Sequence, residues 1–263
     1  MIRWCAYCQS YLGECEPFAD FSLTHCICAK CVAGGKAEEK GVSGRMRSLT
    51  SFFQALRSEV RTGIKSDPGE WVKKGFAMGV KPEDLLIGLI QPALYEIGEL
   101  WSKGEVTVAI EHRFSSFAEE MVSAVYRHYP ELAKNRQAKK PDVLLTNADG
   151  NYHTLGLKFL EVSLLSRGLK TYTVLPGLPG REILELVRAL KPKTLGLSVS
   201  LLPQLRAVRE FAVELTKIPK ADRPLLLLGG LPLKEGLVLP PELQVRCCRG
   251  IQDLDFSDIR PNR

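Results

Sequence analysis

The sequence predicts an α/β protein in which a parallel sheet domain follows a four-helix bundle and a small cysteine-rich head. In the last half of the chain, short apolar runs alternate with amphipathic segments of helix length. The middle carries apolar residues at spacings of three and four, and most cysteines fall within the first 31 residues. The expected parts are a head at 1–33, a linker at 34–47, a helical bundle at 48–132, a linker at 133–141 and a sheet domain at 142–263.

The composition is typical of a cytoplasmic globular protein without a membrane segment. Of the 263 residues, 45% are hydrophobic and 25% are charged, which provides enough core for stability without disulfides. No stretch approaches the roughly 20 consecutive apolar residues that cross a bilayer, and the amino terminus lacks an apolar signal core. The net charge of +6 is scattered along the chain, so the sequence does not indicate direct DNA binding.

Four helices are predicted between residues 48 and 132. The first carries its apolar residues every three or four positions, at Leu49, Phe52, Phe53, Leu56 and Val60. Capping residues and proline predict the later starts, at Asp67-Pro68, Pro82 and near Val106. Short connections between helices favour a bundle.

The sheet domain contains five short apolar runs. They are expected as strands at 143–145, 171–174, 194–198, 225–228 and near 243–245. Because helix-length segments separate the first four runs, the sheet should be parallel. Ligands of such sheets bind beyond the carboxyl ends of the strands.

The loop after the first predicted strand holds the main candidate ligand, His153. It follows short polar residues and precedes Gly156, whose missing side chain would let a bulky group approach the start of the next helix. Taken alone, a loop histidine is more often a solvated or hydrogen-bonded residue than a ligand.

Three stretches together resemble the cobalamin-binding domain family. That family has Asp-x-His-x-x-Gly after the first strand, Ser-x-Leu or Ser-x-Thr after the third and Gly-Gly after the fourth. The matching residues here are Asn151, His153, Gly156, Ser198, Ser200, Gly229 and Gly230. The resemblance implies a base-off, His-on cofactor in which His153 binds cobalt, Ser198 and Ser200 line the slot for the displaced base, and Gly229-Gly230 leaves room for the nucleotide tail.

One position departs from the family pattern. The aspartate that orients the histidine is Asn151 here, and a neutral amide accepts a weaker hydrogen bond than a carboxylate. His153 should therefore be a softer cobalt ligand, unless Asp149 takes the place of that aspartate.

The helical segment contains Trp101, nine residues, and then Glu111-His112. This spacing resembles the motif of light-sensing adenosylcobalamin repressors of the CarH type, which implies an adenosyl group between an indole and a carboxylate. Ser102 stands where those photosensors have a cobalt-capturing histidine. The alternative is that Trp101 belongs to the core and Glu111-His112 to a solvated helix face.

The head has the spacing of a zinc ribbon, with Cys5-x2-Cys8 followed by Cys28-x2-Cys31. His25 and Cys26 are alternative ligands, and a redox-active thiol cluster is the competing interpretation. The stretch also resembles a small cysteine motif appended to bacterial sensor kinases and response regulators, with Cys26 in place of its glycine.

These resemblances lead us to expect an adenosylcobalamin-binding sensory or regulatory protein, such as a photoreceptor, rather than an enzyme. The absence of a DNA-recognition helix implies action through a protein partner, a transcription regulator or a signalling protein, and a homo-oligomer is compatible with the sequence. The alternative is a corrinoid protein that carries methyl groups, with methylcobalamin as cofactor, in a methyltransferase system. A third reading is a mutase subunit that needs a separate barrel chain.

Overall fold

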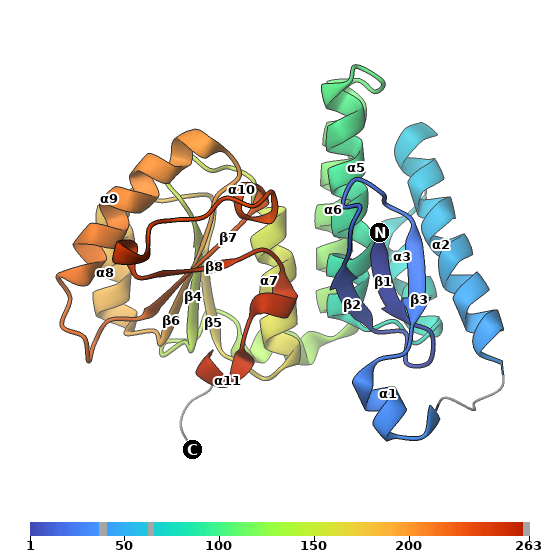
Figure 1. Cartoon of the computed structure of the whole chain (residues 1–263), viewed down its shortest axis with the longest axis horizontal. Coiled ribbons are helices and arrows are strands. Elements are labelled where there is room, and N and C mark those ends of the chain that lie inside the picture. The colour runs from blue at the N-terminus through green and yellow to red at the C-terminus, as the bar shows by residue number, and fades with distance from the viewer. Residues whose placement is uncertain (37–40, 63–65, 260–263) are drawn as a thin grey trace. The chain divides into compact units, whose positions relative to one another are not determined.

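The computed structural model describes residues 1–36, 41–62 and 66–259 and divides the chain into two compact units, Met1–Tyr129 and Pro130–Arg263 (Figure 1). Residues 37–40 of the expected first linker lie outside the described residues. None of the described helices combines the length and the hydropathy that crossing a bilayer requires.

The first unit opens with a small three-stranded sheet of order β2-β1-β3. β1 pairs antiparallel with β2 and parallel with β3. A short helix, α1, follows the sheet. The bounds are β1 Ile2–Cys5, β2 Tyr11–Glu14, β3 Leu23–Cys26 and α1 Ala29–Ala33.

Four helical stretches complete the first unit, and the last three begin close to the predicted starts. The Asp67 side chain accepts a hydrogen bond from the backbone N–H of Glu70 and caps the second stretch, and Thr107 caps the fourth. The third stretch begins at Pro82 and runs on through a π-helical turn, η2. The bounds are α2 Val42–Thr62, α3 Pro68–Ala77, α4 Pro82–Leu85, η2 Leu86–Ile90, α5 Gln91–Ser102 and α6 Val108–His128.

α2 begins earlier than the sequence indicated. Residues 42–47, expected as part of the linker at 34–47, form its first turns. Gly44 and the charges of Arg45 and Arg47 suggested a linker, but one glycine costs a helix only about 1 kcal/mol and arginine is a good helix former.

The second unit contains the predicted parallel sheet, with strand order β5-β4-β6-β7-β8. All neighbouring strands pair in parallel, which confirms the expected α/β class with a parallel sheet. The last strand begins where the expected fifth run ends. The bounds are β4 Val143–Asn147, β5 Thr171–Val174, β6 Thr194–Ser198, β7 Leu225–Gly229 and β8 Val245–Cys248.

Helices cover both faces of this sheet (Figure 1). Successive residues of β4 face opposite sides of the sheet and contribute to two different cores. Leu144 packs with residues of α8 and α9, whereas Leu145 packs with residues of α7. The helices are α7 Leu155–Ser166, α8 Gly180–Leu190, α9 Leu205–Thr216, α10 Leu231–Lys234 and α11 Phe256–Ile259. Short 3-10 turns are η3 Pro130–Asn135, η4 Leu202–Gln204, η5 Pro241–Leu243 and η6 Ile251–Asp253.

The segment expected as a second linker, 133–141, is bound to the sheet domain. Gln137 exchanges two hydrogen bonds with the backbone of Thr173, and Ala138 N donates to Thr171 O. Arg136 pairs with the buried carboxylate of Glu161 on α7 at 2.9 Å. The segment therefore extends the edge of the sheet at β5, a role that its polar composition did not reveal.

Candidate functional site

The loop between β4 and α7 is held by its own polar side chains. The buried amide of Asn147 donates to the carbonyl oxygens of Asn151, at 2.9 Å, and His153, at 3.1 Å. Asn151 N closes a turn on Ala148 O, and Gly150 takes a positive φ of 73° that glycine adopts without strain. These bonds place His153 at the carboxyl end of the sheet in a defined loop.

Asn151 determines the tautomer of His153. The Nδ2 of Asn151 faces the carbonyl oxygen of Ser198 at 2.9 Å, and its Oδ1 faces the backbone N–H of His153 at 3.1 Å, so both partners assign the same amide orientation. The imidazole Nδ1 lies 3.2 Å from the same Oδ1 and must carry the proton. The Nε2 of the exposed His153 is therefore left with a lone pair, as a metal ligand requires.

Asn151→Asp is expected to have opposite effects on folding and on the histidine. A carboxylate cannot donate to Ser198 O, so the fully buried site should lose about 1–3 kcal/mol of unfolding free energy. The same carboxylate should accept more strongly from Nδ1 and raise the basicity of the imidazole. Urea unfolding and an NMR titration of His153 measure the two effects, with Asp149→Asn in the exposed part of the loop as control. An unchanged titration would refute the orienting role of Asn151.

Gln204, which sequence reasoning missed, links two of the loops. Its buried amide accepts from the backbone N–H groups of Ser200, at 2.8 Å, and Leu201, at 3.1 Å, and donates to Gly150 O at 3.1 Å. Ser198 contributes through its backbone carbonyl, while the side chains of Ser198 and Ser200 are half-buried. A glutamine directly after Leu-Leu-Pro gave no motif that could have identified it.

The glycines of the predicted motifs differ in their structural roles. A Cβ on Gly230 would lie 1.7 Å from Val199 O, whereas one on Gly229 would meet only Cys248 O at 3.8 Å. A Cβ on Gly156 would meet nothing within 4 Å. Gly177, not predicted, lets the loop after β5 approach Ala148 O. Gly230 and Gly177 are therefore required by the fold, whereas Gly229 and Gly156 leave open space.

Large apolar side chains are exposed around the same end of the sheet. Tyr152 is 77% exposed after β4, Leu201 and Leu202 follow β6, and Leu231 follows β7. A group of exposed apolar residues at one edge marks a binding surface more often than isolated ones do. This edge could contact a large, flat, partly apolar ligand.

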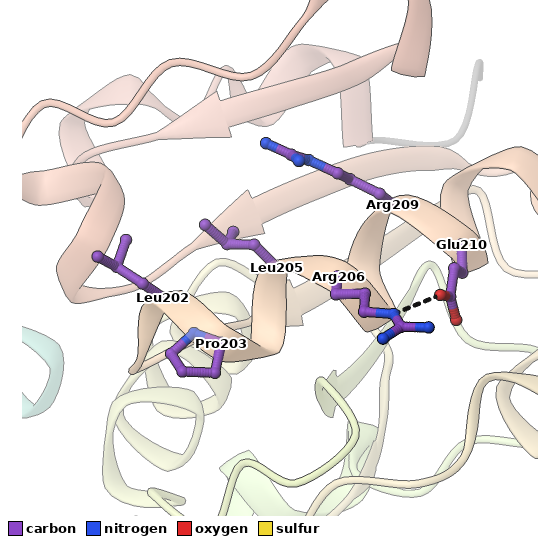
Figure 2. A pocket seen from close by; sticks show the side chains of 6 residues that line it. All are labelled: Leu202, Pro203, Leu205, Arg206, Arg209 and Glu210. Carbon is purple, nitrogen blue, oxygen red and sulfur yellow. Dashed lines mark hydrogen bonds and ion pairs between the residues drawn. The ribbon is translucent and has the colours of Figure 1, made fainter.

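A hollow of about 490 Å³ lies along η4 and the first turns of α9 (Figure 2). Its lining residues are Leu202, Pro203, Leu205, Arg206, Arg209 and Glu210. Arg206 pairs with Glu210 at 3.0 Å, and both are exposed. None of the predicted ligand residues lines this hollow, so we place the candidate site at the loops around His153.

In the helical unit, Trp101, Glu111 and His112 flank the turn that connects α5 to α6. Trp101 is 50% exposed near the end of α5, and Glu111 and His112 are in the first turns of α6. Glu111 accepts from Ser115 Oγ at 2.9 Å and lies 2.5 Å from His112 Nδ1. Trp101 is therefore not a core residue, whereas the exposed His112 agrees with the solvated helix face of the alternative interpretation. Among the described residues, no hydrogen bond or ion pair joins the indole to Glu111 or His112.

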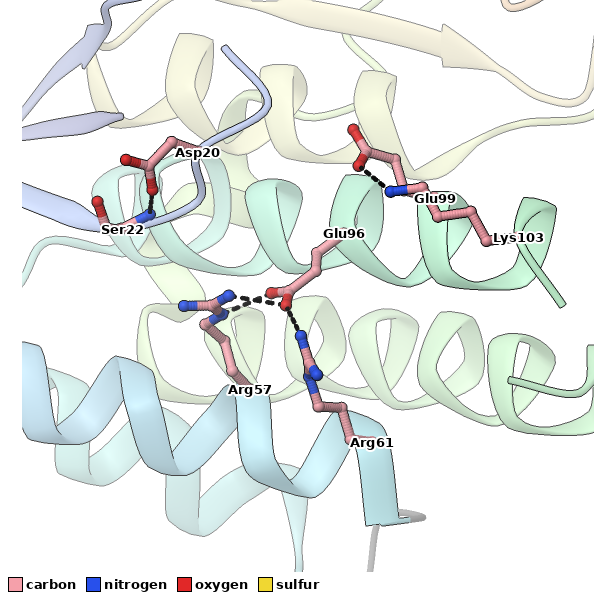
Figure 3. A network of polar contacts seen from close by, with 7 residues as sticks. All are labelled: Asp20, Ser22, Arg57, Arg61, Glu96, Glu99 and Lys103. Atoms are coloured by element: carbon pink, nitrogen blue, oxygen red, sulfur yellow. Dashed lines mark hydrogen bonds and ion pairs between the residues drawn. The ribbon is translucent and has the colours of Figure 1, made fainter. Parts of the chain in front are cut away.

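A buried carboxylate, Glu96, connects two helices of this unit (Figure 3). It accepts from Arg57 Nε at 2.5 Å and from Arg61 at 2.7 Å, joining α5 to α2. Burial alone would raise the pKa of Glu96, but the hydrogen bonds from Arg57 and Arg61 outweigh it and hold the pKa below its ordinary value. One turn further along, Glu99 and Lys103 form an exposed pair at 3.6 Å.

The structure brings together the four predicted thiols of the head. The Sγ atoms of Cys5, Cys8, Cys28 and Cys31 all lie within 4.8 Å of one another, and all four cysteines are free. Burial raises the pKa of Cys5, but backbone N–H groups, including those of Cys8 and Cys28, lower it to about 6. Cys26 lies outside the cluster, with its thiol directed to Trp4 O at 3.7 Å.

Comparison with known proteins gives matches to both parts of the chain. The family model of the B12 binding domain matches residues 53–126, which form most of the helices of the first unit. The trimethylamine corrinoid protein of Methanosarcina barkeri is 23% identical over 75% of this chain and 86% of its own length. Trimethylamine corrinoid protein 2 of Methanosarcina mazei is 22% identical over 75% of this chain and 85% of its own.

Among solved structures, the monomethylamine corrinoid protein of Methanosarcina barkeri resembles this chain with a TM-score of 0.54 and 18% identity. The match covers 75% of this chain and 91% of that one. At this identity the likeness concerns the fold. The chain thus carries a match to the B12 binding domain family in its helical unit and has the fold of a corrinoid protein.

Proposed function

We propose that the chain binds cobalamin with His153 as the lower cobalt ligand and acts as the corrinoid protein of a methyltransferase system. The observation that carries the proposal is the geometry at His153: Asn151 Oδ1 holds Nδ1–H, so Nε2 presents its lone pair at the carboxyl end of the sheet. The family match at 53–126 and the two curated relatives, both corrinoid proteins by name, support it.

The residues present fit this cofactor. A single neutral imidazole suits cobalt, and the exposed apolar residues after β4, β6 and β7 suit the broad face of a corrin. Ser198, Ser200, Gly229 and the open space at Gly156 are the groups we assign to the displaced base and nucleotide tail. When bound, cobalamin supplies a cobalt that can carry a methyl group.

In this role the protein residues orient and tune the metal rather than react. Asn151 sets the direction of the imidazole and, as a neutral acceptor, leaves His153 less basic than a carboxylate partner would. The donor and the acceptor of the methyl group then bind on separate methyltransferase subunits, which are the protein partners this reading implies.

His153→Ala should remove the cobalt–histidine bond. Protein is produced with ¹⁵N-histidine, purified, loaded with cobalamin and reduced to Co(II) for electron paramagnetic resonance. In the wild type, the splitting from the axial nitrogen should be a doublet in labelled protein and a triplet in unlabelled protein. Cofactor affinity should fall by more than the roughly 10- to 100-fold typical of losing an outer-shell partner.

His128→Ala, at an exposed position near the end of α6, is the matched control and should keep the doublet. A triplet in labelled wild-type protein would mean that the nitrogen comes from the cofactor itself, and the His153 assignment would fail.

A sensor that binds adenosylcobalamin is the second candidate, and the exposed Trp101 followed by Glu111-His112 favours it. Protein is incubated in the dark with methylcobalamin or adenosylcobalamin, and absorbance and mass are recorded before and after green light. Preference for the methyl form and transfer of its methyl group to a thiol with a methyltransferase support the carrier. Retention of the adenosyl form with light-dependent change in assembly supports the sensor.

A further inference from the structure

We infer that the amino-terminal head holds one structural zinc ion between Cys5, Cys8, Cys28 and Cys31, and that this ion locks the head onto the π-helical turn of the helical unit. The inference is independent of the cobalamin proposal, because it concerns other residues and is tested on protein without cobalamin.

The distances between the thiols suit a tetrahedral site. Cys5 Sγ lies 3.8 Å from Cys31 Sγ, and Cys8 Sγ lies 3.8 Å from Cys28 Sγ. Four sulfurs at the usual Zn–S distance of about 2.3 Å are about 3.8 Å apart in a regular tetrahedron. The two pairs therefore have the separation that zinc requires, and a disulfide would need sulfurs about 2 Å apart.

The backbone around each Cys-x2-Cys segment supports the site. In the first segment, Cys5–Cys8, Cys5 N donates to Ser10 O and Gln9 N donates to Cys5 O, which forms a tight turn with Gln9 at a φ of 54°. In the second segment, Cys28–Cys31, Cys28 is the N-cap residue of α1, and its backbone N lies 3.4 Å from Cys5 Sγ. The N–H group can stabilise a thiolate there while the sulfur binds metal.

The alternative ligands, His25 and Cys26, lie outside the cluster. The thiol of Cys26 contacts Trp4 O, and His25 does not belong to the group of potential ligands found among the described residues. Four protein thiolates fill a tetrahedral ion, so no position remains for a substrate. This favours a structural ion over one that activates a methyl acceptor.

The head is packed into the helical unit through Trp4, the residue before the ligand Cys5. Trp4 is fully buried and Tyr11 of β2 lies beside it, with ring centroids 6.0 Å apart. A Cβ on Gly88 of η2 would lie 2.6 Å from the Trp4 ring and 2.9 Å from Tyr11. The indole thus occupies space that only a glycine leaves on the π-helical turn. Because Trp4 and the ligand Cys5 are neighbours in β1, the ion fixes the strand that carries the indole.

The first experiment measures metal in full-length protein purified without added zinc. One zinc per chain is expected, and its removal by a chelator should increase amide hydrogen exchange in peptides covering residues 86–90 by at least tenfold. Readdition of Zn²⁺ should restore protection. A folded, metal-free head would overturn the zinc site, and unchanged exchange at 86–90 after zinc removal would overturn the lock.

Matched variants separate metal binding from thiol chemistry. Cys8→Ser should lose zinc, whereas Cys8→His should retain it, since three cysteines and a histidine form a common zinc set. Cys15→Ser should retain zinc and protection. If Cys8→His and Cys8→Ser lost the metal equally while the reduced protein formed a disulfide on mild oxidation, the cluster would be a redox pair and the inference would fail.

Discussion

Gly230→Ala is expected to destabilise the sheet unit by about 2–6 kcal/mol. Gly230 has φ 129° and ψ 178°, a conformation that essentially only glycine adopts, and strain there costs about 1–3 kcal/mol. The added Cβ would also lie 1.7 Å from Val199 O, and crowding of a packed site costs about 1–3 kcal/mol. Urea unfolding followed by circular dichroism measures the loss, and low soluble yield is an expected accompaniment.

Gly229→Ala is the matched control, one residue away. Its Cβ would make only an ordinary contact with Cys248 O at 3.8 Å, so the unfolding free energy should stay within about 0.5 kcal/mol of wild type. If the nucleotide tail of cobalamin passes Gly229, this folded variant should bind the cofactor at least tenfold more weakly. Equal destabilisation by both alanines would contradict the distinction between the two glycines.

Glu96→Gln is expected to cost the helical unit about 3 kcal/mol. The change leaves Arg57 and Arg61 without their carboxylate, and breaking a buried pair usually costs about 3–5 kcal/mol. The lower end applies because both guanidinium groups are partly exposed and can be hydrated. Glu99→Gln, which removes an exposed carboxylate paired with Lys103, should cost less than about 1 kcal/mol.

The stability difference between wild type and Glu96→Gln should depend on pH. Because the pKa of Glu96 is lowered in the folded protein, its contribution to stability is fully present above the ordinary value of 4.5 and is lost as the pH falls through the folded-state pKa. The stability gap between wild type and Glu96→Gln should therefore be constant near neutrality and shrink below pH 4.5. A gap that persisted in acid would show that shape rather than charge stabilises the site.

The comparisons change the balance between the sensor and the methyl carrier, two of the three functions considered from the sequence. The motif Trp101-x9-Glu111-His112 led us to favour an adenosyl-binding sensor, yet the curated relatives are corrinoid proteins by name. The spacing of the motif places the three residues on both sides of the turn between α5 and α6, but it does not determine which ligand their side chains contact. The experiments with methylcobalamin and adenosylcobalamin address that difference.

Periodic patterns predicted the elements of the fold well. The apolar runs at 171–174 and 194–198 became β5 and β6, and Asp67 and Pro82 mark helix starts as expected. Such signals are local: a capping side chain or an alternating apolar run acts within one or two turns. The expected linkers at 34–47 and 133–141 were less accurate, because residues 42–47 join α2 and Gln137 pairs with Thr173 at the sheet edge.

The sequence by itself determined the candidates for the chemistry: a loop histidine after the first strand of the sheet unit, and two pairs of cysteines. Only the tertiary structure decided how they are held. Asn151 reaches Ser198 across the sheet and thereby sets the tautomer of His153. Gly230 is required by the carbonyl of Val199, and Trp4 fits against Gly88. These contacts join residues far apart in the chain, so no local pattern encodes them, and they arise only when packing brings the segments together.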